Sequence, residues 1–149
     1  MKSQSNHNGI ELRHAESPEE ILACYPVMRE LRPHLATPEE FLERVQRQAE
    51  QGYRLLAAWR GDEALALAGY RGMEMLIHGK FIYVDDLVTR EDARGKRLGE
   101  QLLAHLYGMA WEQGCSRVML DTGIANGLAQ RFYFRMGMLP SGLHFGYQV

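Results

Sequence analysis

The pattern of apolar and polar positions predicts two helices near the start of the chain. The segments SPEEILACYPVMREL (17–31) and TPEEFLERVQRQAEQG (37–52) both open with a hydroxyl residue, a proline and two glutamates. A hydroxyl N-cap, a first-turn proline and acidic residues at the positive end of the helix dipole are typical of a helix start. Gly52 ends the second helix. We expect a loose tail over residues 1–9 and a short strand over 10–14 before them.

The middle of the chain predicts three strands. YRLLAAWR (53–60) and ALALAGYRG (64–72) are separated by Gly61-Asp62, which is typical of a hairpin turn. FIYVDDLVT (81–89), rich in aromatic and β-branched residues, follows a break at His78-Gly79.

The last third predicts further helices and strands. Apolar residues at helical spacing mark a helix that ends near Gly114, and they are Leu98, Leu102, Leu106, Met109 and Ala110. RVMLDT (117–122) predicts a short buried strand, and LHFGYQV (143–149) predicts a closing strand. The helix predicted between them, NGLAQRFYFRMG (126–137), has one apolar side with Leu128, Ala129, Phe132, Tyr133 and Met136. No linker interrupts this order, so we predict one α/β domain with a mixed sheet over residues 10–149.

Composition and charge narrow the class of protein. The chain has 149 residues, of which 46% are hydrophobic, enough to bury one core. A net charge of −2 argues against a general nucleic-acid binder, and no apolar run approaches membrane-spanning length. Two cysteines and a polar start without a signal-peptide core favour a reduced setting. We expect a cytoplasmic protein with no nucleic-acid or membrane partner.

Glycine and basic residues cluster where the third predicted helix begins, at Arg94, Gly95, Lys96, Arg97 and Gly99. A strand that leads through a short loop into a helix N-terminus can bind an anion, because unpaired N–H groups point outward. The spacing differs from a nucleoside-triphosphate P-loop and from the dinucleotide motif G-x-G-x-x-G. A solvated turn whose arginines cover the helix end is the alternative interpretation.

Two motifs in this order resemble the GNAT superfamily of acetyl-CoA-dependent N-acetyltransferases. The family signature Arg/Gln-x-x-Gly-x-Gly/Ala falls on residues 94–99, with Arg97 where glycine is usual. The element N-x-x-A-x-x-F-Y-x-x-x-G is matched at Asn126, Ala129, Phe132, Tyr133 and Gly137. The resemblance covers residues 50–149. It implies a central mixed, mostly antiparallel sheet flanked by about four helices, and a homodimer.

The resemblance also implies residue roles. The pyrophosphate of coenzyme A would bind the N–H groups of Arg94, Gly95, Lys96, Arg97, Leu98 and Gly99. The pantetheine arm would lie along Leu87, Val88 and Thr89, and a strand bulge near Leu87 or Val88 would offer an N–H to the oxyanion. Asn126 would bind a pantetheine amide, although it is also a candidate N-cap. Tyr133 would protonate the leaving thiolate, with a core tyrosine as the alternative.

Asp85 and Asp86 interrupt an otherwise apolar strand. Adjacent strand residues point to opposite faces, so we expect the two in different environments. Charges in a central strand are costly unless paired, so at least one belongs to a site or an internal hydrogen-bond network. Asp85 lies nine residues before Arg94, where similar polyamine-acetylating family members carry an acidic residue. We expect Asp85 to be the general base or substrate anchor, and Asp86 to be structural.

These observations predict an enzyme that moves an acetyl group from acetyl-CoA to a primary amine by direct attack. A small-molecule amine is favoured, because no extended groove for a protein tail can be recognised. We expect it to enter from the side of the first two helices and segment 71–80. The alternatives are acetylation of protein N-termini or lysines, and a non-catalytic acyl-CoA-binding sensor. The six histidines lack metal-ligand spacing, so no metal is expected.

Overall fold

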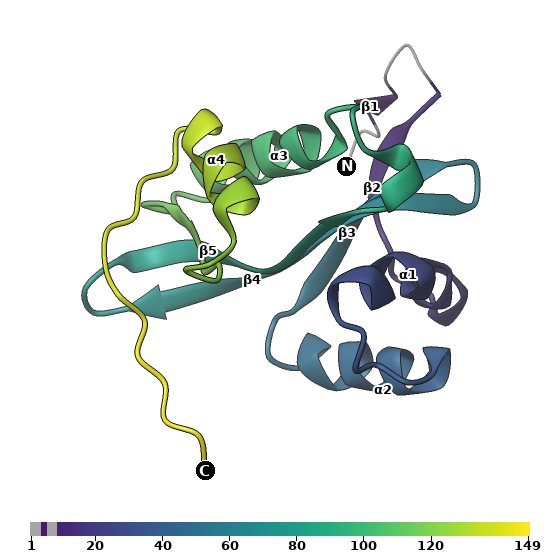
Figure 1. Cartoon of the computed structure of the whole chain (residues 1–149), viewed down its shortest axis with the longest axis horizontal. Coiled ribbons are helices and arrows are strands. Elements are labelled where there is room, and N and C mark those ends of the chain that lie inside the picture. Colours follow the sequence, from purple (N-terminus) through teal and green to yellow (C-terminus); the bar gives the residue numbers. More distant parts are fainter. Residues whose placement is uncertain (1–3, 6–8) are drawn as a thin grey trace. The chain divides into compact units, whose positions relative to one another are not determined.

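The computed structural model describes residues 4–5 and 9–149, and this part of the chain contains four α-helices and one six-stranded sheet (Figure 1). The elements are β1 Gln4–Ser5, β2 Glu11–His14, α1 Pro18–Leu31, α2 Pro38–Ala49, β3 Arg54–Arg60, β4 Glu63–Met75, β5 Gly79–Thr89, the 3-10 helix η1 Glu91–Ala93, α3 Leu98–Glu112, β6 Val118–Leu120 and α4 Gly127–Arg135. The strands follow the order β1-β2-β3-β4-β5-β6, and each pair from β1 to β5 is antiparallel. The predicted α/β fold is confirmed.

The chain divides into two compact units, Met1–Met119 and Leu120–Val149. The first unit contains α1, α2, α3 and the strands from β1 to β5. The second contains α4 and the C-terminal segment.

Local capping explains where α1 and α2 begin. The Ser17 hydroxyl accepts the Glu20 N–H at 3.2 Å, and the Glu20 carboxylate accepts the Ser17 N–H at 3.2 Å. The Thr37 hydroxyl accepts the Glu40 N–H at 3.1 Å. Each cap satisfies a backbone group that the first helical turn leaves unpaired. Both predicted helix starts are therefore confirmed.

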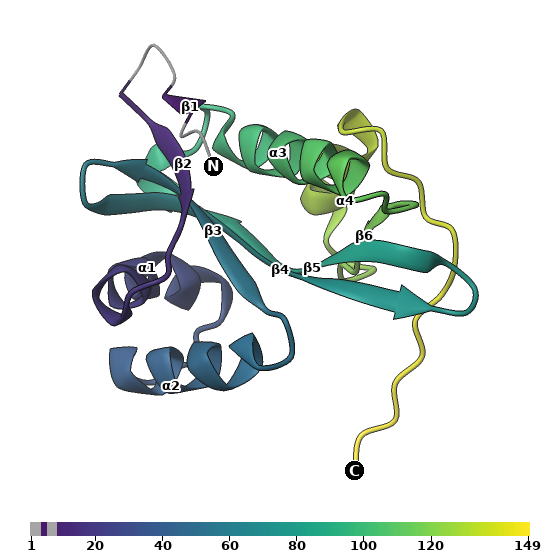
Figure 2. The ribbon, with the colours of Figure 1, turned by 180° about the vertical axis from the view of Figure 1, so that it is seen from behind.

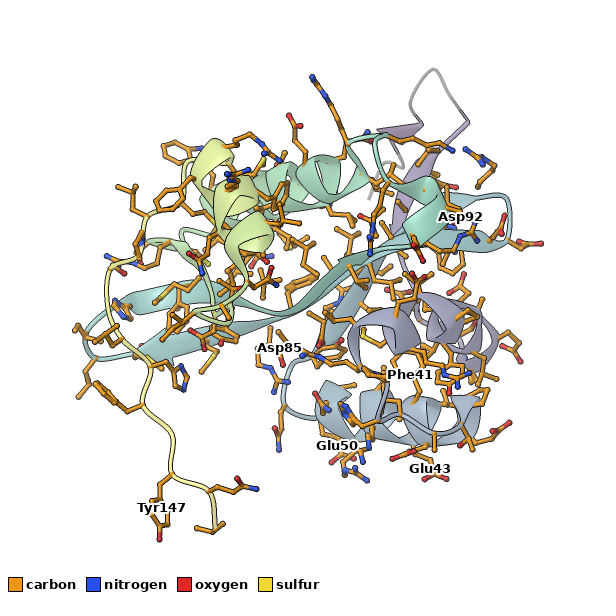
Figure 3. The ribbon with its side chains drawn as sticks, in the orientation of Figure 1. Phe41, Glu43, Glu50, Asp85, Asp92 and Tyr147 are labelled. Carbon is orange, nitrogen blue, oxygen red and sulfur yellow. The ribbon has the colours of Figure 1, made fainter. Side chains whose placement is uncertain are left out.

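Helices cover both faces of the strands in the first unit, with α1 and α2 on one face and α3 on the other (Figures 1 and 2). Leu55, Ala57 and Trp59 of β3 belong to the buried cluster formed with α1 and α2. Leu56 and Ala58 alternate with them and are equally buried. This double coverage explains the continuous apolar run of β3. Phe41 points from α2 toward α1 (Figure 3), where its ring lies 6.0 Å from that of Tyr25.

Three predictions about secondary structure need correction. Part of the expected tail forms strand β1, in which Gln4 pairs with Leu12, whereas residues 1–3 and 6–8 lie outside the described residues. Residues 143–149 form no strand. A strand needs a neighbour to complete its hydrogen bonds, and in Leu120–Val149 no further strand follows β6. Leu128 is 79% exposed and so does not join the half-buried side of α4.

No helix in residues 9–149 is long and apolar enough to cross a membrane.

Candidate active site

A β-bulge in β5 sets the geometry of the site. Gly69 pairs with Asp86 and Tyr70 pairs with Val84, so Asp85 is an extra residue opposite β4. An extra residue interrupts the alternation of side chains and bends the strand. Asp85 and Asp86 consequently line the same pocket. The prediction that they occupy different environments was wrong, because it assumed a regular strand.

The bulge was predicted near Leu87 or Val88, and it lies two residues before Leu87. Leu87 and Val88 themselves pair in regular register with Ala68 and Leu67. The register shift falls between Gly69 and Tyr70, opposite Asp85.

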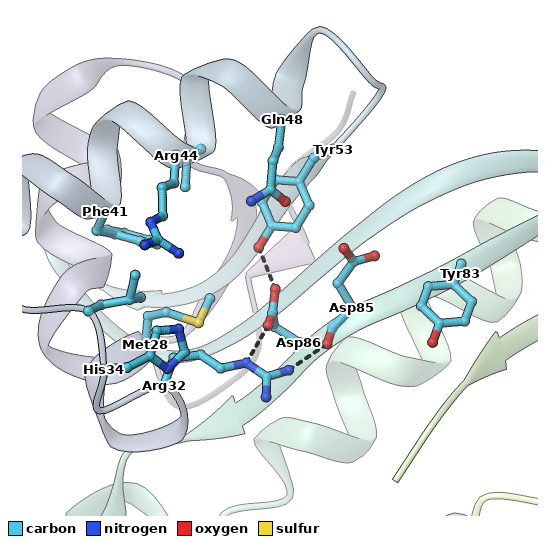
Figure 4. Close-up of a pocket in the computed structure, with 12 residues that line it drawn as sticks. Met28, Arg32, His34, Phe41, Arg44, Gln48, Tyr53, Tyr83, Asp85 and Asp86 are labelled. Atoms are coloured by element: carbon cyan, nitrogen blue, oxygen red, sulfur yellow. Dashed lines mark hydrogen bonds and ion pairs between the residues drawn. The ribbon is translucent and has the colours of Figure 1, made fainter. Parts of the chain in front are cut away.

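The pocket beside the bulge has a volume of about 400 Å³, in the range of small-molecule sites (Figure 4). Side chains from α1, the loop after it, α2, the residue before β3 and β5 line it. They are Met28, Arg32, His34, Leu35, Phe41, Arg44, Val45, Gln48, Tyr53, Tyr83, Asp85 and Asp86. The first two helices therefore line it as expected, whereas no residue of segment 71–80 does.

Asp85 is held by two arginines. Arg71 of β4 donates from Nε to Asp85 Oδ1 at 3.1 Å and from Nη2 to Oδ2 at 2.6 Å. Arg32 donates from Nη2 to the Asp85 carbonyl at 2.9 Å. The hydrogen bonding of Arg71 to the Asp85 carboxylate, which accepts, raises the pKa of Arg71. Arg71 Nη2 also donates to Gln48 Oε1 at 2.9 Å. These contacts fix the carboxylate at the pocket wall.

Asp86 is held by Arg32 as well, and by Tyr53. Arg32 Nε donates to Asp86 Oδ1 at 2.9 Å, and the Tyr53 hydroxyl donates to Oδ2 at 2.9 Å. Burial, followed by the charge of Asp86, raises the pKa of Tyr53 well above its usual value, so Tyr53 stays a donor at neutral pH. A Cβ at Gly69 would lie 1.9 Å from the Tyr53 hydroxyl oxygen, so this network requires glycine there. Both aspartates therefore belong to an internal hydrogen-bond network.

The backbone of β5 beyond the bulge has an edge directed away from β4. The Arg90 N–H donates to the Leu65 carbonyl at 2.8 Å. Hydrogen-bonded and non-bonded pairs alternate along an antiparallel ladder, so the backbone groups of Thr89 and Leu87 point to the other side. Val88, which lies between them, packs against the buried cluster. Residues 87–89 therefore present N–H and C=O groups to which an extended ligand could bind.

The loop before α3 has the geometry of an anion cradle. Arg94, Gly95, Lys96 and Arg97 are exposed, whereas the Leu98 side chain is buried, so this residue can offer only its backbone N–H. No side-chain hydrogen bond caps α3, and its first internal bond runs from the Gln101 N–H to the Arg97 carbonyl. The N–H groups of residues 98–100, Gly99 included, therefore have no partner within the helix.

Arg97 adopts a backbone conformation that normally favours glycine. Its φ is +58°, and it is the only residue other than glycine with a positive φ in the described part of the chain. The neighbouring Gly95 has a φ of +83°. The left-handed region costs a side-chain-bearing residue about 1–2 kcal/mol. The loop thus has the shape that a glycine at position 97 would allow, with a cation in its place.

The second unit contains the remaining two predicted residues. Asn126 Oδ1 accepts the Ala129 N–H at 3.2 Å, which confirms the N-cap and leaves the side-chain NH₂ as a donor. The Tyr133 ring contacts the Phe132 ring edge-on, with centroids 5.4 Å apart. Burial raises the pKa of Tyr133, which keeps its hydroxyl protonated at neutral pH.

Comparisons with known proteins identify the family. Residues 16–138 match the acetyltransferase (GNAT) family, so the chain belongs to this family and is an acyltransferase. It is 31% identical over 125 residues to the N-acetyltransferase YhdJ of Bacillus subtilis. The aligned region covers 83% of this chain and 87% of YhdJ. The expected family is confirmed.

Two solved structures share the fold. An aminoglycoside N-acetyltransferase, AAC(6')-Iy in complex with CoA, aligns with a TM-score of 0.81 at 14% identity, over 100% of this chain and 97% of that one. Glucosamine-6-phosphate N-acetyltransferase from Arabidopsis thaliana aligns with a TM-score of 0.71 at 21% identity, over 93% and 97%.

Sequence reasoning missed three residues that hold the aspartates, namely Arg32, Tyr53 and Arg71. Arg71 could have been found from the sequence. It is a charged residue in the apolar strand β4, and the adjacent strand β5 also carries charged residues, which indicates a cross-strand pair. Arg32 lies 54 residues before Asp86 and at the end of α1, where a basic residue is ordinary helix chemistry. Nothing in the sequence pattern distinguishes it.

Proposed function

We propose that this protein transfers the acetyl group of acetyl-CoA to a primary amine on a small molecule. The observation that carries the proposal is the pocket of about 400 Å³ at the β5 bulge, on the strand whose next three residues offer an open backbone edge. A pocket of this size suits a small acceptor better than a protein tail. Domain boundaries of 10–149, a cytoplasmic location and a homodimer are proposals that rest on the sequence.

We propose that acetyl-CoA is held by the loop before α3 and by the edge of β5. The N–H groups of Gly95, Lys96, Arg97, Leu98 and Gly99 would bind the pyrophosphate, and Arg94, whose own N–H donates to the Glu91 carbonyl at 3.4 Å, would contribute its side-chain charge. The positive charges of the loop add attraction that a neutral cap would lack. Leu87, Val88 and Thr89 would align the pantetheine arm as an added strand, and the side-chain NH₂ of Asn126 would bind one of its amides.

The acceptor amine must lose a proton before it attacks. An alkyl amine has a pKa of about 10.4, so deprotonation at pH 7 costs about 4–5 kcal/mol. We propose that Asp85 accepts this proton, directly or through a water molecule, while Arg71 holds the carboxylate in place. Asp86 would keep its structural role through Arg32 and Tyr53.

Attack of the amine on the thioester places negative charge on the carbonyl oxygen. We propose that the Leu87 N–H, which points away from β4, stabilises this oxyanion. Collapse of the intermediate breaks the carbon–sulfur bond, and Tyr133 would donate its proton to the thiolate. The Tyr133 hydroxyl is protonated when the reaction begins, as a general acid must be, and burial raises its pKa further.

Thiol release from acetyl-CoA with a mixed panel of amines tests the function. We expect release that depends on a small-molecule amine, and weaker acetyl-CoA binding by calorimetry in Gly99→Asp, which adds bulk and negative charge to the loop. Gly108→Asp is the matched control, because Gly108 is exposed in the middle of the same helix. Release only with peptides would favour a protein acetyltransferase. Tight binding without release from any amine would instead favour a sensor.

A further inference from the structure

The charged side chains that line the pocket differ in how many of their hydrogen-bonding atoms have a partner within the protein. Both Asp85 oxygens accept from Arg71, and the Asp86 oxygens accept from Arg32 and Tyr53. Each carboxylate is thus already paired with an arginine. The pocket therefore has little uncompensated negative charge with which to attract a purely cationic ligand.

Arg44 of α2 is in the opposite situation. It lines the pocket, its side chain is 43% exposed, and its Nη2 donates to Glu40 Oε1 at 2.8 Å. A guanidinium has five N–H donors, so this single bond leaves most of them for a ligand. The partner carboxylate is shared, because Glu40 also accepts the Ala36 N–H at 3.0 Å. A partly exposed ion pair four residues apart on a helix holds its partners only weakly.

Donors and apolar groups divide the pocket into distinct sides. Figure 4 shows Arg44 and His34 on the helical side, with Asp85 on the strand side. Apolar side chains of α1 and α2 also line the pocket, including Met28, Phe41 and Val45. A ligand that matches this lining has an amine at one end, a carbon skeleton and an acceptor-rich group at the other end.

We propose that the acceptor amine carries an anionic group, a carboxylate or a phosphate, which Arg44 binds. This inference rests on the proposed function and names the substrate class for the same pocket. His34 supplies a further N–H donor beside the anion. Arg44 binds the anion through two parallel hydrogen bonds, as its planar fork does with carboxylate and phosphate groups.

Matched amines test the proposal. Ethanolamine, O-phosphoethanolamine and β-alanine share a two-carbon amine and carry at the other end a hydroxyl, a phosphate and a carboxylate. We call an amine that carries a phosphate or carboxylate anionic, and an amine without such a group neutral. We expect a higher kcat/KM for the anionic amines than for the neutral one. The phosphate and carboxylate arms show which anion is preferred. Arg44→Gln should lower the anionic-to-neutral ratio by about ten-fold, because a hydrogen bond to a charged group is lost.

Two further variants separate binding from a general charge effect. Arg44→Lys keeps the charge and should retain part of the preference. Arg47→Gln removes an exposed charge from the same helix outside the pocket and should leave the ratio unchanged. An anionic-to-neutral ratio that is not raised in the wild type, or that survives Arg44→Gln, overturns the proposal. If neutral amines alone release thiol, this inference fails and the proposed function stands. If acetyl-CoA does not bind in calorimetry, the proposed function itself fails.

Discussion

Gly69→Ala tests whether the Tyr53–Asp86 contact shapes the pocket wall. An added Cβ would lie 1.9 Å from the Tyr53 hydroxyl oxygen, 2.6 Å from its Cζ and 2.8 Å from Asp86 Oδ2. Tyr53 is buried, with 5% of its surface exposed, so its rigid ring has little room to withdraw. Overpacking of a buried site costs about 1–3 kcal/mol, and loss of a hydrogen bond to a charged group costs about 1.5–3 kcal/mol. We expect a net destabilisation of about 2 kcal/mol or more.

The measurement is the thermal midpoint of unfolding beside that of Gly72→Ala. Gly72 lies in the same strand, and a Cβ there would meet nothing within 4 Å, so this control should be neutral or slightly stabilising. A loss of about 2 kcal/mol corresponds to a Tm lower by about 4–8 °C. Gly69→Ala should also raise KM for the amine, because Asp86 lines the pocket. Equal Tm values for the two variants would refute the described contact.

Four further predictions concern single residues. Arg97→Gly should raise the free energy of unfolding by about 0.5–1 kcal/mol in denaturant titrations, because the left-handed backbone strain disappears. Tyr133→Phe should lower kcat by about 10²–10⁴-fold with little change in acetyl-CoA affinity, as expected for loss of a general acid. Asp85→Asn should lower kcat/KM for the amine and leave acetyl-CoA binding unchanged. Burial, and then the charge of Arg54, lowers the pKa of His14 to about 4. Its unfolded state takes up a proton below about pH 6.5, so stability should fall between pH 6.5 and 4, and less so in His14→Gln.

Each of these predictions has a control or a contradicting result. Lys96→Gly changes the loop at a residue without a positive φ and should destabilise the protein, unlike Arg97→Gly. Near-wild-type kcat in Tyr133→Phe, in a reaction limited by chemistry, would mean that the ring only packs. If Asp86→Asn depresses kcat/KM while Asp85→Asn does not, the two roles are exchanged. Equal acid sensitivity of wild type and His14→Gln would remove His14 as the cause.

Local signals were sufficient to predict most elements of the fold. The start of α1 was predicted because Ser17, Pro18 and Glu20 act on backbone groups within one turn. The strand β3 was predicted because helices cover both of its faces, which makes the whole run apolar. The prediction of a strand at 143–149 was wrong because the residue pattern says nothing about a neighbouring strand. Alternation describes a strand's two faces but supplies no neighbour for its backbone.

The site depends on contacts that a linear pattern does not contain. Alternation predicted different environments for Asp85 and Asp86, because an extra residue in a ladder leaves no mark in the sequence of one strand. The pairing of Asp86 with Arg32 joins residues 54 apart, and is set by the packing of α1 on the sheet. The family signature showed only that Arg97 stands where glycine is usual, and the left-handed φ of Arg97 gives a physical reason for glycine at that position.

The most direct test of the proposed function is the stoichiometry of the reaction with one accepted amine. Mass spectrometry should detect the N-acetylated amine and free CoA in equal amounts, with both rates lowered together in Tyr133→Phe. CoA release without an acetylated amine, or acetyl-CoA that stays bound and unchanged with every amine supplied, would contradict acetyl transfer by this protein.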